Sequence, residues 1–381
     1  MNFQLRKNAL TKGLRPRHIV LLCLLLAATL FRLSPSLGGT YTAYVYPALA
    51  HLVAPVTGAI PLAVGDIFIA LSIAWVVGYP PFAVLIRKKP LRPTLLRVAE
   101  YLLWLYVWFY AAWGINYAQP DIFHRLHMPR AEVRADAFQA FAERYADSLN
   151  ASYCPIVRKP EERAMRQMAI QGYSHLRSMG VNQPFAPGAR AKTMLFSRLS
   201  SMAGITGSMG PFFCEFTINA DVRPHDYPAT YAHEYAHLLG IANEGEANFY
   251  SYLVCTSATS RAVRFSGYYL IFFHVLQGVR NILGHKAYEA YLHRLRPEVI
   301  RLAKADRRYW QSLRCPIIDK AQTFLYDLYL RGNHVEGGTR SYSTVIAIIM
   351  SWEEKNNTDH QRINGNSDNR RQPFTEKQKR L

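Results

Sequence analysis

Three long apolar segments near the start of the chain constrain its fold more than any other feature. They cover residues 18–33, 67–86 and 98–118, and none contains more than one acidic residue. A segment of roughly 20 apolar residues matches the thickness of a bilayer, in which only helices and closed barrels satisfy the backbone polar groups. The first segment lacks the small-residue cleavage site of a signal peptide. We therefore predict a transmembrane region of three helices within residues 1–118.

The charges beside these segments predict how they cross the membrane. Lysines and arginines precede the first segment, and five more occupy residues 87–97, between the second and the third. Residues 34–63 contain no Lys, Arg, Asp or Glu. Because cytoplasmic loops collect Lys and Arg, the chain after the third segment is expected on the extracytoplasmic side.

The net charge of +19 could also indicate a nucleic-acid-binding protein. Much of the excess, however, flanks the apolar segments or lies close to the C-terminus. The remaining basic residues are expected on a solvated surface or facing anionic lipid. We therefore predict that the chain meets the lipid bilayer and does not bind nucleic acid.

From residue 119 onward the composition is that of a water-exposed domain. We predict a mainly helical α+β domain over residues 119–352 with a small sheet, whose best strand candidate is Phe212–Ile218 because aromatic and β-branched residues favour strands. Residues 353–381 are polar and unpatterned, which predicts a disordered basic tail. Residues 41–59 are apolar but contain two prolines. We expect an interfacial or re-entrant segment there, and no fourth span.

Four cysteines lie in the predicted domain: Cys154, Cys214, Cys255 and Cys315. On the extracytoplasmic side they could form one or two disulfides, and three pairings of the four are possible. Buried free thiols are an equal alternative, and the sequence leaves the choice open.

The sequence His233-Glu234-Tyr235-Ala236-His237 has the form H-E-x-x-H. Residues four apart share a face of an α-helix, so both imidazoles can bind one zinc ion. Glu234 can then reach a water that the zinc activates and take its proton as the general base. Pro228 suits the first turn of such a helix, and Gly240 suits its end. We therefore predict Zn²⁺ bound by His233 and His237, with Glu234 as the catalytic residue.

Two glutamates compete for the position of the third metal ligand. Glu244 and Glu246 open a second helix, which is expected to begin near Asn243. Glu244 shares a face with Asn248, whereas Glu246 follows Asn243 by three residues and could complete a capping box with it. We prefer Glu244 and keep Glu246 as the alternative. A reading in which both are ordinary first-turn acids also remains open.

Residues that could polarise the substrate or orient the ligands are less constrained. An oxyanion in a transition state needs a hydrogen-bond donor. The candidates for this role, or for a partner of a metal ligand, are Asn248, His225 and Tyr342, with Tyr231, His334 and Arg340 as further nominees. Residues 215–220 are either an edge strand that binds an extended peptide by β-augmentation or a plain sheet strand.

At these motifs the chain resembles a bacterial family of membrane zinc-peptidase-like proteins that is known only as a domain of unknown function. Its members have three N-terminal spans, then H-E-x-x-H-x-x-G, then E-x-E-A-N-F. The matching residues are His233–Gly240 and Glu244–Phe249, together with Trp113–Tyr117 and Gly338–Tyr342. The resemblance covers roughly residues 17–352. It implies a bacterial inner (cytoplasmic) membrane protein that binds zinc.

More distantly, Glu244-x-x-Ala247-Asn248 is similar to the E-x-x-A-D element of the membrane zinc peptidases that include prenyl-protein and heat-shock proteases. In those enzymes the leading glutamate is the third ligand, which implies the same for Glu244. This chain has Asn248 where they have Asp, so the role of that acid is not carried over.

Together these features predict a multi-pass membrane protein with a zincin-like domain that hydrolyses peptide bonds of a peptide or protein substrate. The alternative is a non-catalytic zinc-binding receptor or scaffold of the cell envelope, which would use the same fold and metal.

Overall fold

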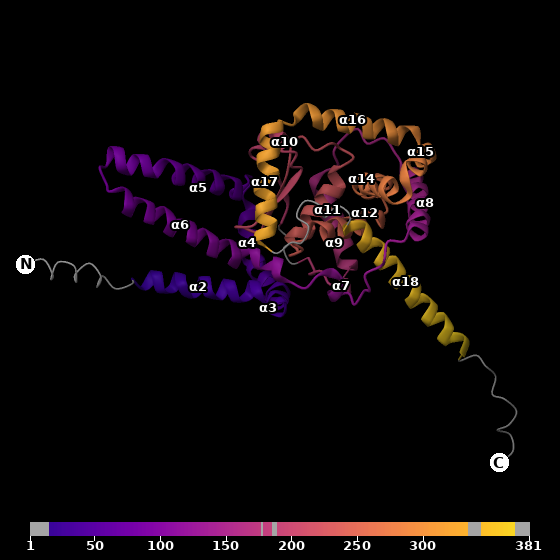
Figure 1. Cartoon of the computed structure of the whole chain (residues 1–381), viewed down its shortest axis with the longest axis horizontal. Coiled ribbons are helices and arrows are strands. Elements are labelled where there is room, and N and C mark those ends of the chain that lie inside the picture. The colour runs from indigo at the N-terminus through magenta and orange to yellow at the C-terminus, as the bar shows by residue number, and fades with distance from the viewer. Residues whose placement is uncertain (1–14, 177, 185–188, 334–343, 370–381) are drawn as a thin grey trace, which may run out of the picture.

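Three apolar helices extend from one side of a helical domain in the computed structural model (Figure 1). The structure describes residues 15–176, 178–184, 189–333 and 344–369. The helices are α2 (Pro16–Leu33), α5 (Val64–Pro81, continued by the π-helix η2, Phe82–Ile86) and α6 (Leu91–Ala112). Each is long and apolar enough to cross a membrane. The three predicted segments thus form three candidate membrane-spanning helices, as expected of a membrane protein.

The third span differs from its predicted bounds of 98–118. It begins at Leu91, because Arg92 and Arg97 can extend their long side chains toward the membrane surface from its first turns. It ends at Ala112, because the backbone of Trp113 leaves the helical region. Gly114–Ala118 then forms a 3₁₀ helix, η3, whose first three residues are buried.

The basic ends of the spans lie together. The N-terminal end of α2 and the turn between α5 and α6 are at the end of the helices that points away from the domain (Figure 1). This arrangement places Arg17 and Arg87–Lys89 at one end of the three helices. Arg17 also donates a hydrogen bond to Glu100 of α6 at 2.9 Å. The predicted grouping of the basic loops on one side therefore agrees with the arrangement of the helices.

The segment between the first two spans packs against the domain. It forms α3 (Pro35–Thr40), the π-helix η1 (Tyr41–Val45) and α4 (Tyr46–Ala59). Tyr46 is fully buried, and its hydroxyl donates to the carbonyl of Leu238 at 2.7 Å. Among the helices that the structure describes, this segment is not a candidate span, as its prolines predicted.

A three-stranded sheet lies beside the central helices. Its strands are β1 (Ala191–Thr193), β2 (Gly207–Gly210) and β3 (Glu215–Ile218), in the order β1-β3-β2. β3 pairs in parallel with β1 and antiparallel with β2. Of the two alternatives for residues 215–220, the structure has the plain sheet strand, because β3 is the central strand. The edge beside the central helices belongs to β2.

A buried ion pair joins this sheet to the membrane region. Lys192 of β1 pairs with Glu215 of β3, and both side chains are almost fully buried. The Lys192 ammonium also donates to the carbonyls of Thr57 and Leu62, each at 2.9 Å. Glu215 accepts the backbone N–H of Gly65, in the first turn of α5. The sheet is therefore tied to the segment that leads into the second span.

The core of the domain forms around two helices, α11 (Tyr227–Leu238) and α12 (Glu244–Thr256), which pack against each other. Most of their residues are buried. The surrounding helices are α7 (Ile122–Arg125), α8 (Ala135–Ser152), α9 (Glu162–His175), α10 (Ser197–Met202), α13 (Arg261–Leu270), α14 (Phe272–Gly278), η4 (Val279–Leu283), α15 (Gly284–Arg294), α16 (Pro297–Leu313), α17 (Pro316–Gly332) and α18 (Thr344–Asn369). The predicted small sheet in a mainly helical domain is confirmed.

Residues 353–369, the first part of the predicted disordered tail, are helical in the structure. Helix α18 begins in the core, where most of the residues from Val345 to Ser351 are buried, and continues to Asn369. Once a turn is formed, each further residue adds a hydrogen bond at little cost, so a polar sequence can extend a nucleated helix. Glu353 accepts a hydrogen bond from Arg144 at 2.7 Å. Residues 370–381 lie outside the described residues.

The five cysteines are free thiols. Of the two alternatives for Cys154, Cys214, Cys255 and Cys315, the structure has the one without disulfides. Cys214 and Cys255 are buried, and burial raises the pKa of both thiols to about 12.

Candidate metal centre

The two histidines of the H-E-x-x-H motif lie on one face of α11. The helix begins after Asp226 with Pro228 in its first turn, and it ends before Gly240, which has a φ of +92°. Both boundaries agree with the sequence-based prediction. The Nε2 atoms of His233 and His237 are 3.1 Å apart. The helical spacing therefore brings the two imidazoles together, as expected.

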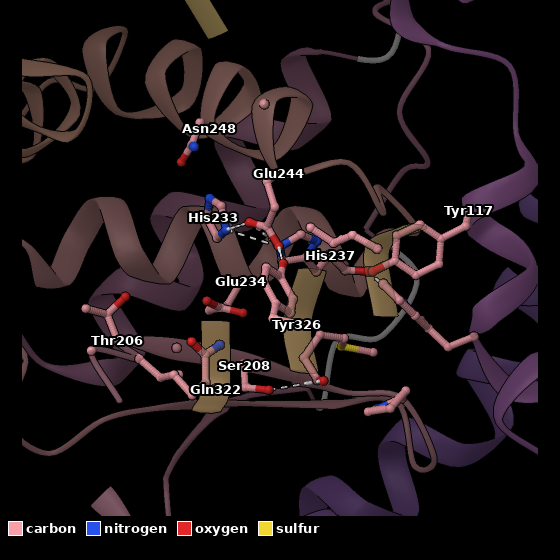
Figure 2. A pocket seen from close by; sticks show the side chains of 18 of the residues that line it. Tyr117, Thr206, Ser208, His233, Glu234, His237, Glu244, Asn248, Gln322 and Tyr326 are labelled. Atoms are coloured by element: carbon pink, nitrogen blue, oxygen red, sulfur yellow. Dashed lines mark hydrogen bonds and ion pairs between the residues drawn. The ribbon is translucent and has the colours of Figure 1, made fainter. Parts of the chain in front are cut away.

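The next helix returns to the same place and supplies a carboxylate. Asn243 caps α12 by accepting the backbone N–H of Glu246 at 3.1 Å. Glu244 then places its Oε2 at 3.1 Å from His233 Nε2 and at 3.6 Å from His237 Nε2 (Figure 2). Ligand atoms of a tetrahedral zinc with bonds of about 2.0–2.2 Å lie about 3.3–3.6 Å from one another. The three donor atoms thus have a spacing that fits this ion.

Glu246 lies on the opposite face of α12, because two residues along a helix correspond to a rotation of about 200°. It is buried, and it accepts hydrogen bonds from the backbone of Ile122 at 3.0 Å and from Arg125 at 2.6 Å. Its carboxylate thus ties α12 to α7. The geometry brings Glu244 to the histidines and does not bring Glu246 there.

One of the two imidazoles is oriented by the backbone. Nδ1 of His237 donates to the carbonyl of Ile241 at 2.6 Å, so Nε2 is the ring nitrogen that faces Glu244 and His233. Such a contact to the second ring nitrogen is the usual companion of a histidine ligand. Nδ1 of His233 is buried and has no partner among the described residues. Asn248 lines the same pocket and lies beside His233 (Figure 2).

The buried charges of this cluster act on one another. Burial disfavours the charged form of His237, but the Glu244 carboxylate outweighs it and raises the pKa of His237 to about 9. Burial likewise disfavours the charged form of Glu244, but the two imidazoles hold the pKa of its carboxyl well below the usual range. For Glu234, burial dominates and raises the pKa of the carboxyl. The pKa values of the two carboxyl groups thus shift in opposite directions, because the imidazoles outweigh burial at Glu244 and burial outweighs the imidazoles at Glu234.

Glu234 is buried beneath the histidines and faces strand β2. Its Oε2 has no hydrogen-bond partner among the described residues. Its Oε1 lies so close to the backbone of Gly207 that a Cβ at this glycine would be 2.2 Å away. An unpartnered buried carboxylate oxygen carries a free-energy penalty unless it serves a bound group. This orphaned oxygen, next to the three convergent donor atoms, fits a site that holds a metal ion and a water.

These residues line a pocket of about 680 Å³. Its floor is formed by α11 and α12, and one wall is β2 with the preceding residues Gly204–Thr206. The end of α6 and helix α17 form the other sides. Tyr326 of α17 donates its hydroxyl proton to Glu244 Oε1 at 2.6 Å, and Gln322, one turn earlier, also points into the pocket (Figure 2).

Sequence reasoning missed Tyr326 and Gln322, although their i, i+4 spacing on an amphipathic helix was a signal. It also nominated residues that lie elsewhere. His225 is buried and bonds Asp306 at 2.9 Å, and Tyr231 donates to Glu162 at 2.9 Å. Neither of these two lines the pocket. Tyr342, His334 and Arg340 lie outside the described residues.

The C-terminal end of the motif helix is held by residues from the membrane region. The last carbonyls of a helix have no partner within it and need other donors. Trp113 donates its Nε1–H to the carbonyl of His237 at 3.2 Å, Tyr46 donates to Leu238, and Gln119 donates to Gly240 at 2.7 Å. The position of His237 therefore depends on the ends of the segments that lead from the spans.

The fold and the site define a membrane protein with three candidate spans and a helical domain that carries a candidate metal centre. Residues 41–350 match the family described as "Protein of unknown function (DUF3810)". The match covers most of the chain, so the chain belongs to this family, and the expected membership in a family of unknown function is confirmed. No curated protein and no solved structure matches the chain.

Proposed function

We propose that this protein is a membrane-anchored, zinc-dependent metallopeptidase with a zincin-like catalytic domain. The observation that carries the proposal is the convergence of His233, His237 and Glu244 beside the unpartnered carboxylate of Glu234. Two histidines, one carboxylate and an open position for water are the ligand set of a catalytic zinc site. The surrounding pocket has room for several residues of an extended peptide.

Each residue has a role in this proposal. His233, His237 and Glu244 would hold the zinc ion, which supplies a Lewis acid that polarises a carbonyl and lowers the pKa of water. Glu234 would accept the proton of the attacking water at Oε2 and pass it to the leaving amine. Tyr326 steadies Glu244 through its hydrogen bond to Oε1. Asn248 is the candidate partner of His233. Gln322 and Tyr326 are further candidate donors near the substrate, beside Tyr342, which lies outside the described residues.

Strand β2 offers a backbone on which a peptide substrate can align. The backbone N–H of Asn219 donates to Thr206, so by the alternation of an antiparallel ladder Ser208 and Gly210 also face β3. The peptide groups of Gly207 and Met209 then face away from β3. Because β2 lines the pocket, an extended peptide could add to this edge with its carbonyl close to the metal ligands.

For the location of the domain we propose the extracytoplasmic side of a bacterial inner membrane. The basic ends of the spans group at the end that points away from the domain, and such ends remain in the cytoplasm. Reporter fusions after residue 89 and after residue 369 test this. We expect cytoplasmic activity for the first fusion and extracytoplasmic activity for the second, and the reverse result would contradict the proposal.

Zinc content separates the two glutamates that the sequence left in competition. We expect the purified protein in detergent to contain about one zinc ion per chain. Glu244→Gln and His237→Ala should lose most of it, because each removes one of three protein ligands. Glu246→Gln should retain it, since Glu246 faces Arg125. Metal analysis after dialysis measures the content. Loss in Glu246→Gln with retention in Glu244→Gln would overturn the assignment of the third ligand.

Gly207→Ala tests the position of the proposed general base. The added Cβ would meet Glu234 Oε1 at 2.2 Å, so the carboxylate must move. A displacement of about 1 Å at a reacting group can lower the rate about 10²-fold. We expect a loss of peptide cleavage of about this size with zinc content unchanged. Gly78→Ala in α5, where an added Cβ meets nothing within 4 Å, is the matched control and should retain cleavage. Equal activity of both variants would contradict this placement of Glu234.

A further inference from the structure

Helix α17 has its amphipathic pattern reversed. Its polar residues Gln322 and Tyr326 face the pocket, whereas Ile317, Phe324, Leu325 and Leu328 are 60–80% exposed. We call these four residues the outer face of α17. A helix that covers a pocket in water would normally turn its apolar side inward and its polar side outward. The outer face therefore suits contact with an apolar environment and not with water.

The position of α17 identifies that surrounding. In Figure 1 the helix lies on the side of the domain from which the spans leave, and it runs across their direction. Its C-terminal end is fixed at the domain-side ends of two spans. Arg32 at the end of α2 donates to the carbonyl of Gly332, and Tyr110 near the end of α6 donates to Asn333 at 2.7 Å.

The other end of α17 is close to the start of the second candidate span, α5. α10 packs against α17, and the N–H of Cys315, just before α17, donates to Met202 at the end of α10. Just before α10, the backbone of Leu195 donates to Asp66 in the first turn of α5 at 2.8 Å. Leu195, Phe196 and Leu199 are also about half exposed. Both ends of α17 therefore lie at the level where the spans leave the domain.

The charges along α17 lie beside its outer face and leave that face apolar. Lys320 and Arg331 are exposed, Arg331 pairs with Asp327 at 2.7 Å, and Arg314 before the helix lies 3.9 Å from Asp319. Because acids and bases on the helix balance, the apolar area would supply most of the binding to a membrane surface.

We propose that α17 is an interfacial helix whose outer face is inserted into the lipid surface around the three spans. The bilayer is then the partner that covers Ile317, Phe324, Leu325 and Leu328. The opposite side of the same helix closes the pocket, so the lipid contact fixes the position of Tyr326 above Glu244. This inference rests on exposure and position, and it holds whether or not the site hydrolyses peptides.

A depth measurement in liposomes tests the proposal. Three accessible cysteines, Cys23, Cys154 and Cys315, are first replaced by serine or alanine, and the two buried thiols are left. Leu325→Cys is then labelled with an environment-sensitive fluorophore, and the full chain is reconstituted with phosphatidylethanolamine and phosphatidylglycerol. A portion of the lipid carries a nitroxide quencher near the headgroup. His285→Cys, exposed on α15 on the side of the domain away from the spans, is the matched control.

We expect the label on Leu325→Cys to be quenched several-fold more strongly than the label on His285→Cys. Adding Phe324→Asp and Leu328→Asp should remove most of this difference, while the zinc content reports that the domain is still folded. Equal quenching at both positions would overturn the proposal. So would a label that is shielded from water but not quenched, because a protein partner or a second copy would then cover the face.

Discussion

Glu234→Gln is expected to lower peptide hydrolysis by about 10²–10⁴-fold, the usual contribution of a general base, without removing zinc. Glutamine has nearly the shape of glutamate, so the packing against Gly207 is kept. It cannot accept a proton from water, however, and Oε2 of the carboxylate that it replaces has no hydrogen-bond partner among the described residues. The loss should therefore appear in the rate and not in metal content.

The measurement is cleavage of a mixture of unstructured peptides by the detergent-solubilised chain, followed by mass spectrometry, with zinc quantified in the same preparation. Glu289→Gln, an exposed residue of α15, is the matched control and should retain full activity. If the parent and Glu234→Gln cleave equally, another enzyme in the preparation is responsible, and the general-base role is wrong. Stoichiometric zinc with no cleavage by either chain would instead favour the receptor or scaffold.

Lys192→Met is expected to destabilise the domain by about 3–5 kcal/mol, the cost of leaving a buried charge without its partner. The substitution leaves the Glu215 carboxylate in the interior with only the N–H of Gly65. It also removes the donor from the carbonyls of Thr57 and Leu62. These groups join the sheet to the start of α5. We therefore expect that, on heating the variant, the sheet separates from the membrane region before the rest of the domain unfolds.

Thermal unfolding in detergent, followed by circular dichroism, measures the effect. The double variant Lys192→Met with Glu215→Leu should recover much of the stability, because it leaves no unpaired charge inside. Arg294→Met is the control for an exposed ion pair, with Asp147, and should leave stability almost unchanged. If Lys192→Met and Arg294→Met unfold at the same temperature as the parent, the buried pair does not hold the sheet in place.

The local features of the site could be predicted from the sequence. Pro228 and Gly240 determine where α11 begins and ends, and the spacing of His233 and His237 places them on one face. Asn243 marks the start of α12. These features depend on neighbours within a few residues, where helical periodicity and capping preferences decide the conformation.

Other features depend on contacts between distant parts of the chain. Glu244 and Glu246 both suit a first helical turn, and only the packing of α12 against α11 and α7 places one at the histidines and the other at Arg125. Similarly, the composition of residues 215–218 predicts a strand, but it does not predict where that strand lies in the sheet. The pairing of β3 with both β1 and β2 makes β3 the central strand. Pairing order is a property of the assembled sheet, and the composition of one strand does not contain it.

The sequence by itself therefore determined three candidate spans, their basic ends and two histidines with a glutamate on one helix, because hydrophobic length and helical period are local. Only the tertiary structure decided which glutamate lies at the histidines, which strand forms the edge of the sheet and which helix covers the pocket. The donors that hold the end of α11 come from Tyr46, Trp113 and Gln119, more than 100 residues earlier. Likewise, the sequence does not show that Tyr326 faces the pocket or that the apolar side of α17 is exposed, because both depend on how α17 packs on the domain.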